Sequence, residues 1–177
     1  MEDRIWRYAP EPRATGHGPD TAHRVASSPG SAVRPFFILG ITPRLAQSFE
    51  LPPWRTAREV VQAESATLEN ALRPGTERAV LLVAEDTEGE LGGYVYVNAE
   101  TDYFGRTHAH IGILTVSSPA EGRGAGRTLV EAAEEWARVE GLDRITLNVF
   151  ANNQRARSVY ERLGYAPETL HYVKPLT

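Results

Sequence analysis

The chain contains no cysteine among its 177 residues, which excludes disulfide bonds, thiolate metal ligands and a cysteine nucleophile. It also lacks an apolar run of about 18 residues, the length that a membrane-spanning helix needs, so the sequence predicts a soluble protein with no membrane partner. The amino terminus is charged and has no apolar core of a signal peptide. A cytoplasmic location is therefore expected.

A strong excess of charge of one sign is missing as well. The chain has 19 basic and 23 acidic residues and a formal net charge of -4, so no nucleic-acid partner is expected. Lysine is nearly absent, since Lys174 is the only one and the other basic residues are arginines. The length and the 41% of hydrophobic residues suit one domain with a sizeable core.

The most informative stretch present is a glycine-rich turn between residues 121 and 127. Glycine occupies every second position from 122 to 126, and Arg123 and Arg127 add positive charge. An apolar run over 111–116 predicts a buried strand before the turn, and apolar residues at helical spacing predict a helix after it. Such a turn offers free backbone N–H groups at the positive end of a helix and therefore suits phosphate. The alternative is a flexible loop without a ligand.

Two common nucleotide motifs fit this turn poorly. The Gly-Lys-Ser/Thr ending of a P-loop is missing, and Arg127 stands where a dinucleotide fingerprint has its third glycine. The next predicted strand ends near Asn148 and Val149, without the acidic residue that binds ribose. A dinucleotide-dependent enzyme is therefore a distant alternative.

Residues 1–32 are interpreted as an amino-terminal extension, and residues 33–177 as the folded domain. The extension is rich in proline and glycine, lacks periodicity and is expected to be partly disordered. Its Ile5, Trp6 and Tyr8 could dock on the domain or on a partner.

The rest of the chain predicts an α/β fold of the α+β kind, with a mixed sheet covered by helices. Capping signals predict helices that begin near Thr42 and at Thr56, the second with a Thr-x-x-Glu capping box. Gly141 is a predicted left-handed cap of the helix that follows the glycine turn. Strands are predicted over 33–38, 79–84, 91–98, 108–116 and 144–149, one or two more over 165–176, and a further helix over 153–163.

Two motifs together resemble the GNAT superfamily of acyl-CoA-dependent N-acetyltransferases. The family's loop pattern, Gln/Arg-x-x-Gly-x-Gly/Ala, aligns with residues 121–126. A second family pattern, Asn-x-x-Ala-x-x-x-Tyr-x-x-x-Gly-Phe/Tyr, aligns with Asn153, Ala156, Tyr160, Gly164 and Tyr165. The resemblance covers residues 76–176 well and 33–75 weakly, and it implies the GNAT fold, with a central, mostly antiparallel mixed sheet flanked by helices.

The resemblance implies acetyl-CoA as cosubstrate. The backbone of Leu114, Thr115 and Val116 would pair with the pantetheine arm, and Asn153 would bind the cofactor or a water, or else only cap a helix. The pyrophosphate would lie on Arg123, Gly124, Ala125, Gly126, Arg127 and Thr128. Glu121 departs from the family pattern, because a carboxylate near pyrophosphate is repulsive. We therefore expect weakened cofactor binding or a Glu121 side chain that turns outward.

Direct attack of an amine on a thioester needs a base and an acid. By resemblance, Tyr160 matches the family's general acid; the alternative is a core aromatic on a helix face. His110 falls where many family members carry a glutamate, and an ordinary histidine pKa near 6.5 suits proton removal at neutral pH. Glu100 and Asp102 are reserve bases.

His108 shares a strand face with His110, because side chains alternate along a strand. A His-x-His pair can bind metal, but no third ligand lies nearby in the sequence, so no metal site is predicted. Two polar residues at the start of a strand are the remaining interpretation.

The sequence thus predicts an N-acetyltransferase that moves an acetyl group from acetyl-CoA to a primary amine through a ternary complex. The alternative is a non-catalytic acyl-CoA-binding regulatory module. The acceptor would be a small-molecule amine or a protein amino group, in a pocket around residues 40–75 and 98–107. A homodimer is left open.

Overall fold

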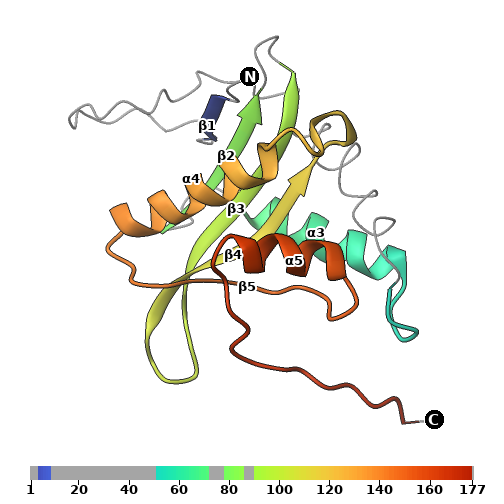
Figure 1. Ribbon diagram of the computed structural model, residues 1–177. Helices are drawn as coiled ribbons and strands as arrows, with labels where there is room; N and C mark the ends of the chain where they lie inside the picture. The colour runs from blue at the N-terminus through green and yellow to red at the C-terminus, as the bar shows by residue number, and fades with distance from the viewer. Residues whose placement is uncertain (1–3, 9–50, 72–77, 86–89, 177) are drawn as a thin grey trace.

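The computed structural model describes residues 4–8, 51–71, 78–85 and 90–176, and Figure 1 shows their arrangement. Five strands form one sheet in the order β1-β2-β3-β4-β5. Neighbours are antiparallel except β4 and β5, which are parallel. The strands are β1 (Arg4–Tyr8), β2 (Ala79–Glu85), β3 (Leu91–Thr101), β4 (Thr107–Val116) and β5 (Ile145–Leu147). The helices are α3 (Ala57–Ala71), α4 (Ala125–Val139), α5 (Gln154–Arg162) and a short 3-10 helix η2 (Ser118–Ala120).

Helices cover both faces of the sheet, which confirms the predicted fold class. Helix α4 packs its buried stripe, which includes Leu129 and Trp136, on one face. Helix α3 contributes Leu68 to a second apolar cluster on the opposite face, with Tyr94 and Tyr96 of β3. In Figure 1, α4 and α5 are both drawn in front of the sheet and α3 lies behind it.

A β-bulge in β4 decides which side chains share the α3 face. The register passes from Tyr96 opposite Ile113 to Val97 opposite Ile111, so Gly112 is the extra residue. A Cβ on Gly112 would lie 3.2 Å from the Tyr96 ring, which explains the glycine. Because of the bulge, His110 lies on the same face as Ile113, although the two are three positions apart.

Two predicted helix ends are confirmed in detail. Thr56 N–H donates to the Glu59 carboxylate (2.7 Å), and Glu59 N–H donates to the Thr56 hydroxyl (3.3 Å), which is the reciprocal capping box. At the end of α4, Gly141 has φ 71°, and Leu142 N–H donates to the Ala137 carbonyl (2.9 Å). These features form a Schellman cap.

Residues 4–8 of the predicted extension form β1, which pairs with β2 at the sheet edge, and Ile5 packs against the core. This segment therefore docks on the domain, one of the two alternatives left open for it. Other predictions need correction. Residues 165–176 form no strand; they run as an irregular segment with exposed Leu170, Tyr172 and Leu176, since none of the described strands pairs with them. The strand predicted over 144–149 is only three residues long. The strand predicted over 33–38 and the helix near Thr42 lie outside the described residues.

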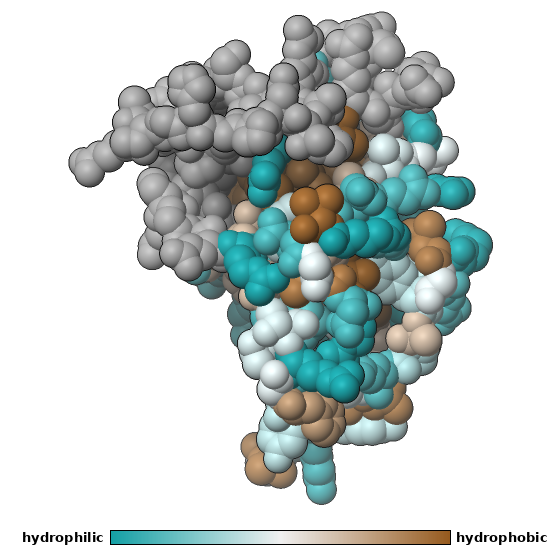
Figure 2. Space-filling model, turned by 90° about the vertical axis from the view of Figure 1, so that its left-hand side faces the viewer, coloured by the Kyte–Doolittle hydropathy of each residue, from teal (hydrophilic) through white to brown (hydrophobic). Residues whose placement is uncertain are grey.

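No helix of the described residues is long and apolar enough to cross a membrane. Figure 2 shows one face of the molecule, on which apolar side chains of the described residues form small separate groups among hydrophilic ones. The apolar side chains are instead concentrated in the two clusters that sandwich the sheet.

Candidate active site

The glycine turn forms a donor-rich start of α4. Gly124 is the cap residue of the helix and has φ 99°, a conformation that glycine adopts without strain. The first helical bond runs from Thr128 N–H to the Gly124 carbonyl (3.0 Å). Helix geometry therefore leaves the N–H groups of residues 124–127 without an intrahelical acceptor. Arg123 N–H is already used by the Ala120 carbonyl (3.2 Å), so the donors available to an anion are fewer than the sequence suggested.

Glu121 is turned toward α5 and ion-paired. Its carboxylate lies 2.8 Å from the guanidinium of Arg155. The pair is exposed and contributes little to stability, but it balances the negative charge beside the turn. Sequence reasoning missed Arg155, although its place two residues after Asn153 in the second motif marked it as a neighbour. Arg127 pairs with Glu131 on the outer surface of α4 (2.7 Å).

Strands β4 and β5 part just before the turn. β5 pairs with β4 only from Ala109 to Ile111. In the described part of the chain, Leu114, Thr115 and Val116 pair with β3 on one side and with no strand on the other. An unpaired strand edge can bind an extended ligand through its main chain. This edge leads through η2 directly into the free N–H groups of α4.

Helix α5 carries the two other predicted residues. Asn153 accepts a hydrogen bond from Ala156 N–H (3.1 Å), so it caps α5, and its amide nitrogen is not used in that cap. Tyr160 is half-buried, and burial raises the pKa of its hydroxyl. Its ring lies 5.8 Å from that of Tyr165, which donates to Glu134 of α4 (3.3 Å).

The hydrogen bonds of His110 define its tautomer. Its Nδ1 lies 2.8 Å from the Thr146 hydroxyl on β5, which itself donates to the Ala109 carbonyl (3.3 Å). With that donation in place, the Thr146 oxygen accepts from Nδ1–H of His110, and in this tautomer Nε2 keeps a free lone pair. Burial lowers the pKa of His110, with a smaller opposing effect of Glu100, so the imidazole is neutral at neutral pH.

The two predicted catalytic residues lie on different sides of the sheet. His110 lies on the face that α3 covers, and Tyr160 belongs to α5 beside α4 (Figure 1). Among the described residues, no hydrogen bond joins them.

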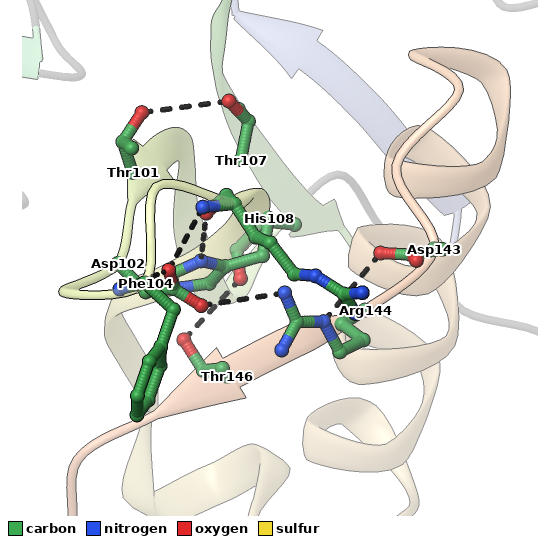
Figure 3. A network of polar contacts seen from close by, with 10 residues as sticks. Thr101, Asp102, Phe104, Thr107, His108, Asp143, Arg144 and Thr146 are labelled. Atoms are coloured by element: carbon green, nitrogen blue, oxygen red, sulfur yellow. Dashed lines mark hydrogen bonds and ion pairs between the residues drawn. The ribbon is translucent and has the colours of Figure 1, made fainter.

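The two reserve bases differ. Asp102 Oδ1 accepts from the backbone of Phe104 and Arg106 (both 2.9 Å), and Arg144 lies 3.3 Å from Oδ2, as Figure 3 shows. These interactions, the backbone bond from Arg106 first, lower the pKa of Asp102 and make it a poor base. Glu100 is exposed and lies opposite His108 on β3.

Comparisons with known proteins show a family match. A family model described as the acetyltransferase (GNAT) family matches residues 44–165. Mycothiol acetyltransferase of Beutenbergia cavernae is 34% identical over 90 residues, which are 51% of this chain and 29% of that protein. The uncharacterized N-acetyltransferase YhfO of Bacillus subtilis is 32% identical over 125 residues, 67% of this chain and 79% of that protein. This chain spans less than a third of the mycothiol acetyltransferase.

Solved structures share the fold. An acetyl transferase candidate from Pyrococcus furiosus is 30% identical with a TM-score of 0.61, and the match covers 76% of this chain and 88% of that one. AAC(6')-Iy, solved with the bisubstrate analog CoA-S-monomethyl-acetylneamine, has a TM-score of 0.52 at 17% identity, over 70% of this chain and 84% of that one.

Proposed function

Because the chain belongs to the acetyltransferase (GNAT) family, we propose that it transfers an acetyl group from acetyl-CoA to a primary amine by direct attack, with both substrates bound together. The observation that carries this proposal is the continuity of two ligand-binding features. The unpaired edge of β4 at Leu114–Val116 runs into the free N–H groups at the start of α4. An extended arm that ends in a pyrophosphate suits that combination.

The chain's own residues fit acetyl-CoA at this place. The N–H groups of residues 124–127 would hold phosphate oxygens at the positive end of α4. Thr128 would contribute no backbone donor, because its N–H is used within the helix. The Arg155 guanidinium keeps the Glu121 carboxylate from acting as an unpaired charge there. When bound, acetyl-CoA supplies an activated acyl thioester.

His110 and Tyr160 would move the protons. His110 Nε2 would accept the proton of the attacking amine, while the Nδ1–H bond to Thr146 holds the ring in place. Tyr160 would donate its proton to the departing thiolate, and burial, which raises its pKa, keeps that proton on the hydroxyl until it is needed. No covalent enzyme intermediate is required, because the amine itself is the nucleophile.

The acceptor is proposed to be a small-molecule primary amine. Support comes from the mycothiol acetyltransferases among the relatives, whose name refers to a small molecule. The β3–β4 turn, with its exposed Tyr103 and Phe104, lies within the region where the sequence places the acceptor pocket.

Calorimetric titration with acetyl-CoA, with CoA and NAD as controls, tests the cofactor assignment. We expect acetyl-CoA and CoA to bind and NAD not to bind. Free-thiol release in the presence of a panel of amines then tests transfer. Binding of acetyl-CoA without release of free thiol in the presence of any amine would favour a non-catalytic acyl-CoA-binding module. Binding of NAD in preference to CoA would overturn the proposal.

His110→Gln tests the base in the same assay. Glutamine keeps a hydrogen-bonding side chain but has no basic nitrogen, so thiol release should fall by roughly 10²–10⁴-fold. Acetyl-CoA affinity should stay within about twofold, because His110 is not among the proposed cofactor-binding residues. Equal turnover of the variant would transfer the role to Glu100 or to water.

A further inference from the structure

Strand pairing brings together three metal-ligating side chains that are apart in the sequence. Glu100 of β3 is the direct antiparallel partner of His108 of β4, and His110 follows two positions along on the same face. Each of the three residues offers one potential ligand atom, and these atoms all lie within 4.8 Å of one another. The third ligand that the sequence around the His-x-His pair lacked is thus supplied by the neighbouring strand.

Each of the two imidazoles is held by its Nδ1. His110 Nδ1 lies 2.8 Å from the Thr146 hydroxyl, and His108 Nδ1 lies 3.4 Å from the Arg106 carbonyl. A carbonyl can only accept, so this contact favours the hydrogen on Nδ1 of His108 as well. Both Nε2 atoms then keep their lone pairs. This arrangement, with Nδ1–H on a protein acceptor, is how most metal-binding histidines are oriented.

The carboxylate is oriented too. The Asn98 side-chain amide donates to Glu100 Oε1 (3.0 Å), so the second oxygen of Glu100 is available. His108 is 8% exposed, whereas Glu100 lies at the surface, so the cluster has a buried floor and an open side.

From these observations we propose that Glu100, His108 and His110 form a binding site for a divalent transition-metal ion of the zinc type. Two imidazole nitrogens and one carboxylate suit zinc and exclude magnesium or calcium as preferred ions, since these ions favour oxygen ligands. Zinc bonds of about 2.1 Å at tetrahedral angles separate ligands by roughly 3.4 Å, so the three atoms would draw closer. Rotation of the exposed Glu100 side chain, with loss of its hydrogen bond from Asn98, supplies this movement for the carboxylate, and small rotations of the imidazole rings would supply it for the histidines.

The ion would occupy the same Nε2 lone pair that the proposed function assigns to proton removal. In this respect the inference rests on the proposed function, because bound zinc would prevent His110 from accepting a proton. Zinc would therefore inhibit acetyl transfer, and removal of zinc by a chelator would restore it. The binding itself does not depend on any activity.

Titration of the full-length protein with Co²⁺ and Zn²⁺ tests the site directly. We expect one equivalent of Co²⁺ to give visible absorption of a low-coordinate nitrogen-containing site, and one equivalent of Zn²⁺ to displace it. Glu100→Gln and His108→Gln should each weaken binding by at least about tenfold. His171→Gln is the matched control, since it removes a histidine outside the cluster and should change nothing.

The outcomes separate the two proposals. Absence of stoichiometric binding, or binding that survives His108→Gln and Glu100→Gln, would overturn the metal site whatever the enzyme assay shows. Binding that both variants weaken would support the site even in a protein that transfers no acetyl group. With an active protein, inhibition by Zn²⁺ that is lost in His108→Gln would link the ion to His110.

Discussion

Single residues near the end of α5 show why one tyrosine suits catalysis better than another. Burial raises the pKa of both Tyr160 and Tyr165, and the Glu134 carboxylate raises that of Tyr165 further. Tyr165 already donates its hydroxyl hydrogen to Glu134. Among the described residues, Tyr160 has no such acceptor, so its proton is available to a leaving group.

Tyr160→Phe should therefore lower the turnover number by roughly 10²–10³-fold, the range of a lost general acid, with acetyl-CoA affinity within about twofold. Steady-state thiol release and calorimetry measure the two quantities. Tyr165→Phe is the control. It removes a neighbouring hydroxyl whose hydrogen is already donated to Glu134, so turnover should stay within a few-fold of the wild type. Equal losses in both variants would assign the effect to packing.

At the level of elements, the two ends of α4 carry glycines in the same conformation. Gly124 at the start and Gly141 at the end both have left-handed φ angles, 99° and 71°, and a Cβ on either would meet nothing within 4 Å. A side chain at either position would therefore be strained by the backbone alone. Only the first position lies beside the free N–H groups of the helix.

Gly124→Val and Gly141→Val should each cost about 1–3 kcal/mol of unfolding free energy from backbone strain. Gly124→Val should in addition weaken acetyl-CoA binding by more than tenfold, because a branched side chain stands where phosphate approaches. Urea denaturation and calorimetry on both variants measure the two effects. Retained binding in Gly124→Val would place the pyrophosphate elsewhere.

For the molecule as a whole, one half-buried carboxyl couples global stability to pH. Glu64 lies on α3, its Oε2 is buried without a hydrogen-bond partner among the described residues, and burial raises its pKa to about 7. Between its ordinary pKa of 4.5 and about 7, the folded state holds a proton that the unfolded state releases. The contribution of the protonated Glu64 to the unfolding free energy is therefore fully present below pH 4.5, and it is lost as the pH rises through about 7.

Glu64→Gln should remove this dependence. The unfolding free energy of the variant minus that of the wild type should rise by about 2 kcal/mol from pH 5 to pH 8. This value is reduced for the partial exposure of the side chain. Urea denaturation at a series of pH values measures the difference. Glu69→Gln, at an exposed position on the same helix, is the control. A wild-type-to-variant difference that stays constant with pH would contradict the assignment.

Much of the fold was predictable because its signals are local. The Thr56–Glu59 capping box and the left-handed Gly141 depend on a few adjacent residues, and the structure confirms both. The antiparallel hairpin of β2 and β3 was likewise visible as two apolar runs around a polar turn. Segment 165–176 has strand-like residues, but a strand needs a partner, and residue pattern does not supply one.

In the sequence by itself, two spaced motifs carried the resemblance to the family. The glycine turn and the elements that hold Tyr160, His110 and Asn153 could also be predicted, because periodicity, capping and left-handed glycines act over one or two turns of chain. The tertiary structure determined which distant residues those side chains contact. Arg155 reaches Glu121, Thr146 orients His110, and Glu100 faces His108, each through pairing of distant segments. The contacts of His110 and His108 depend on the register of β3, β4 and β5, and the Arg155–Glu121 pair depends on where α5 packs; no local pattern specifies either.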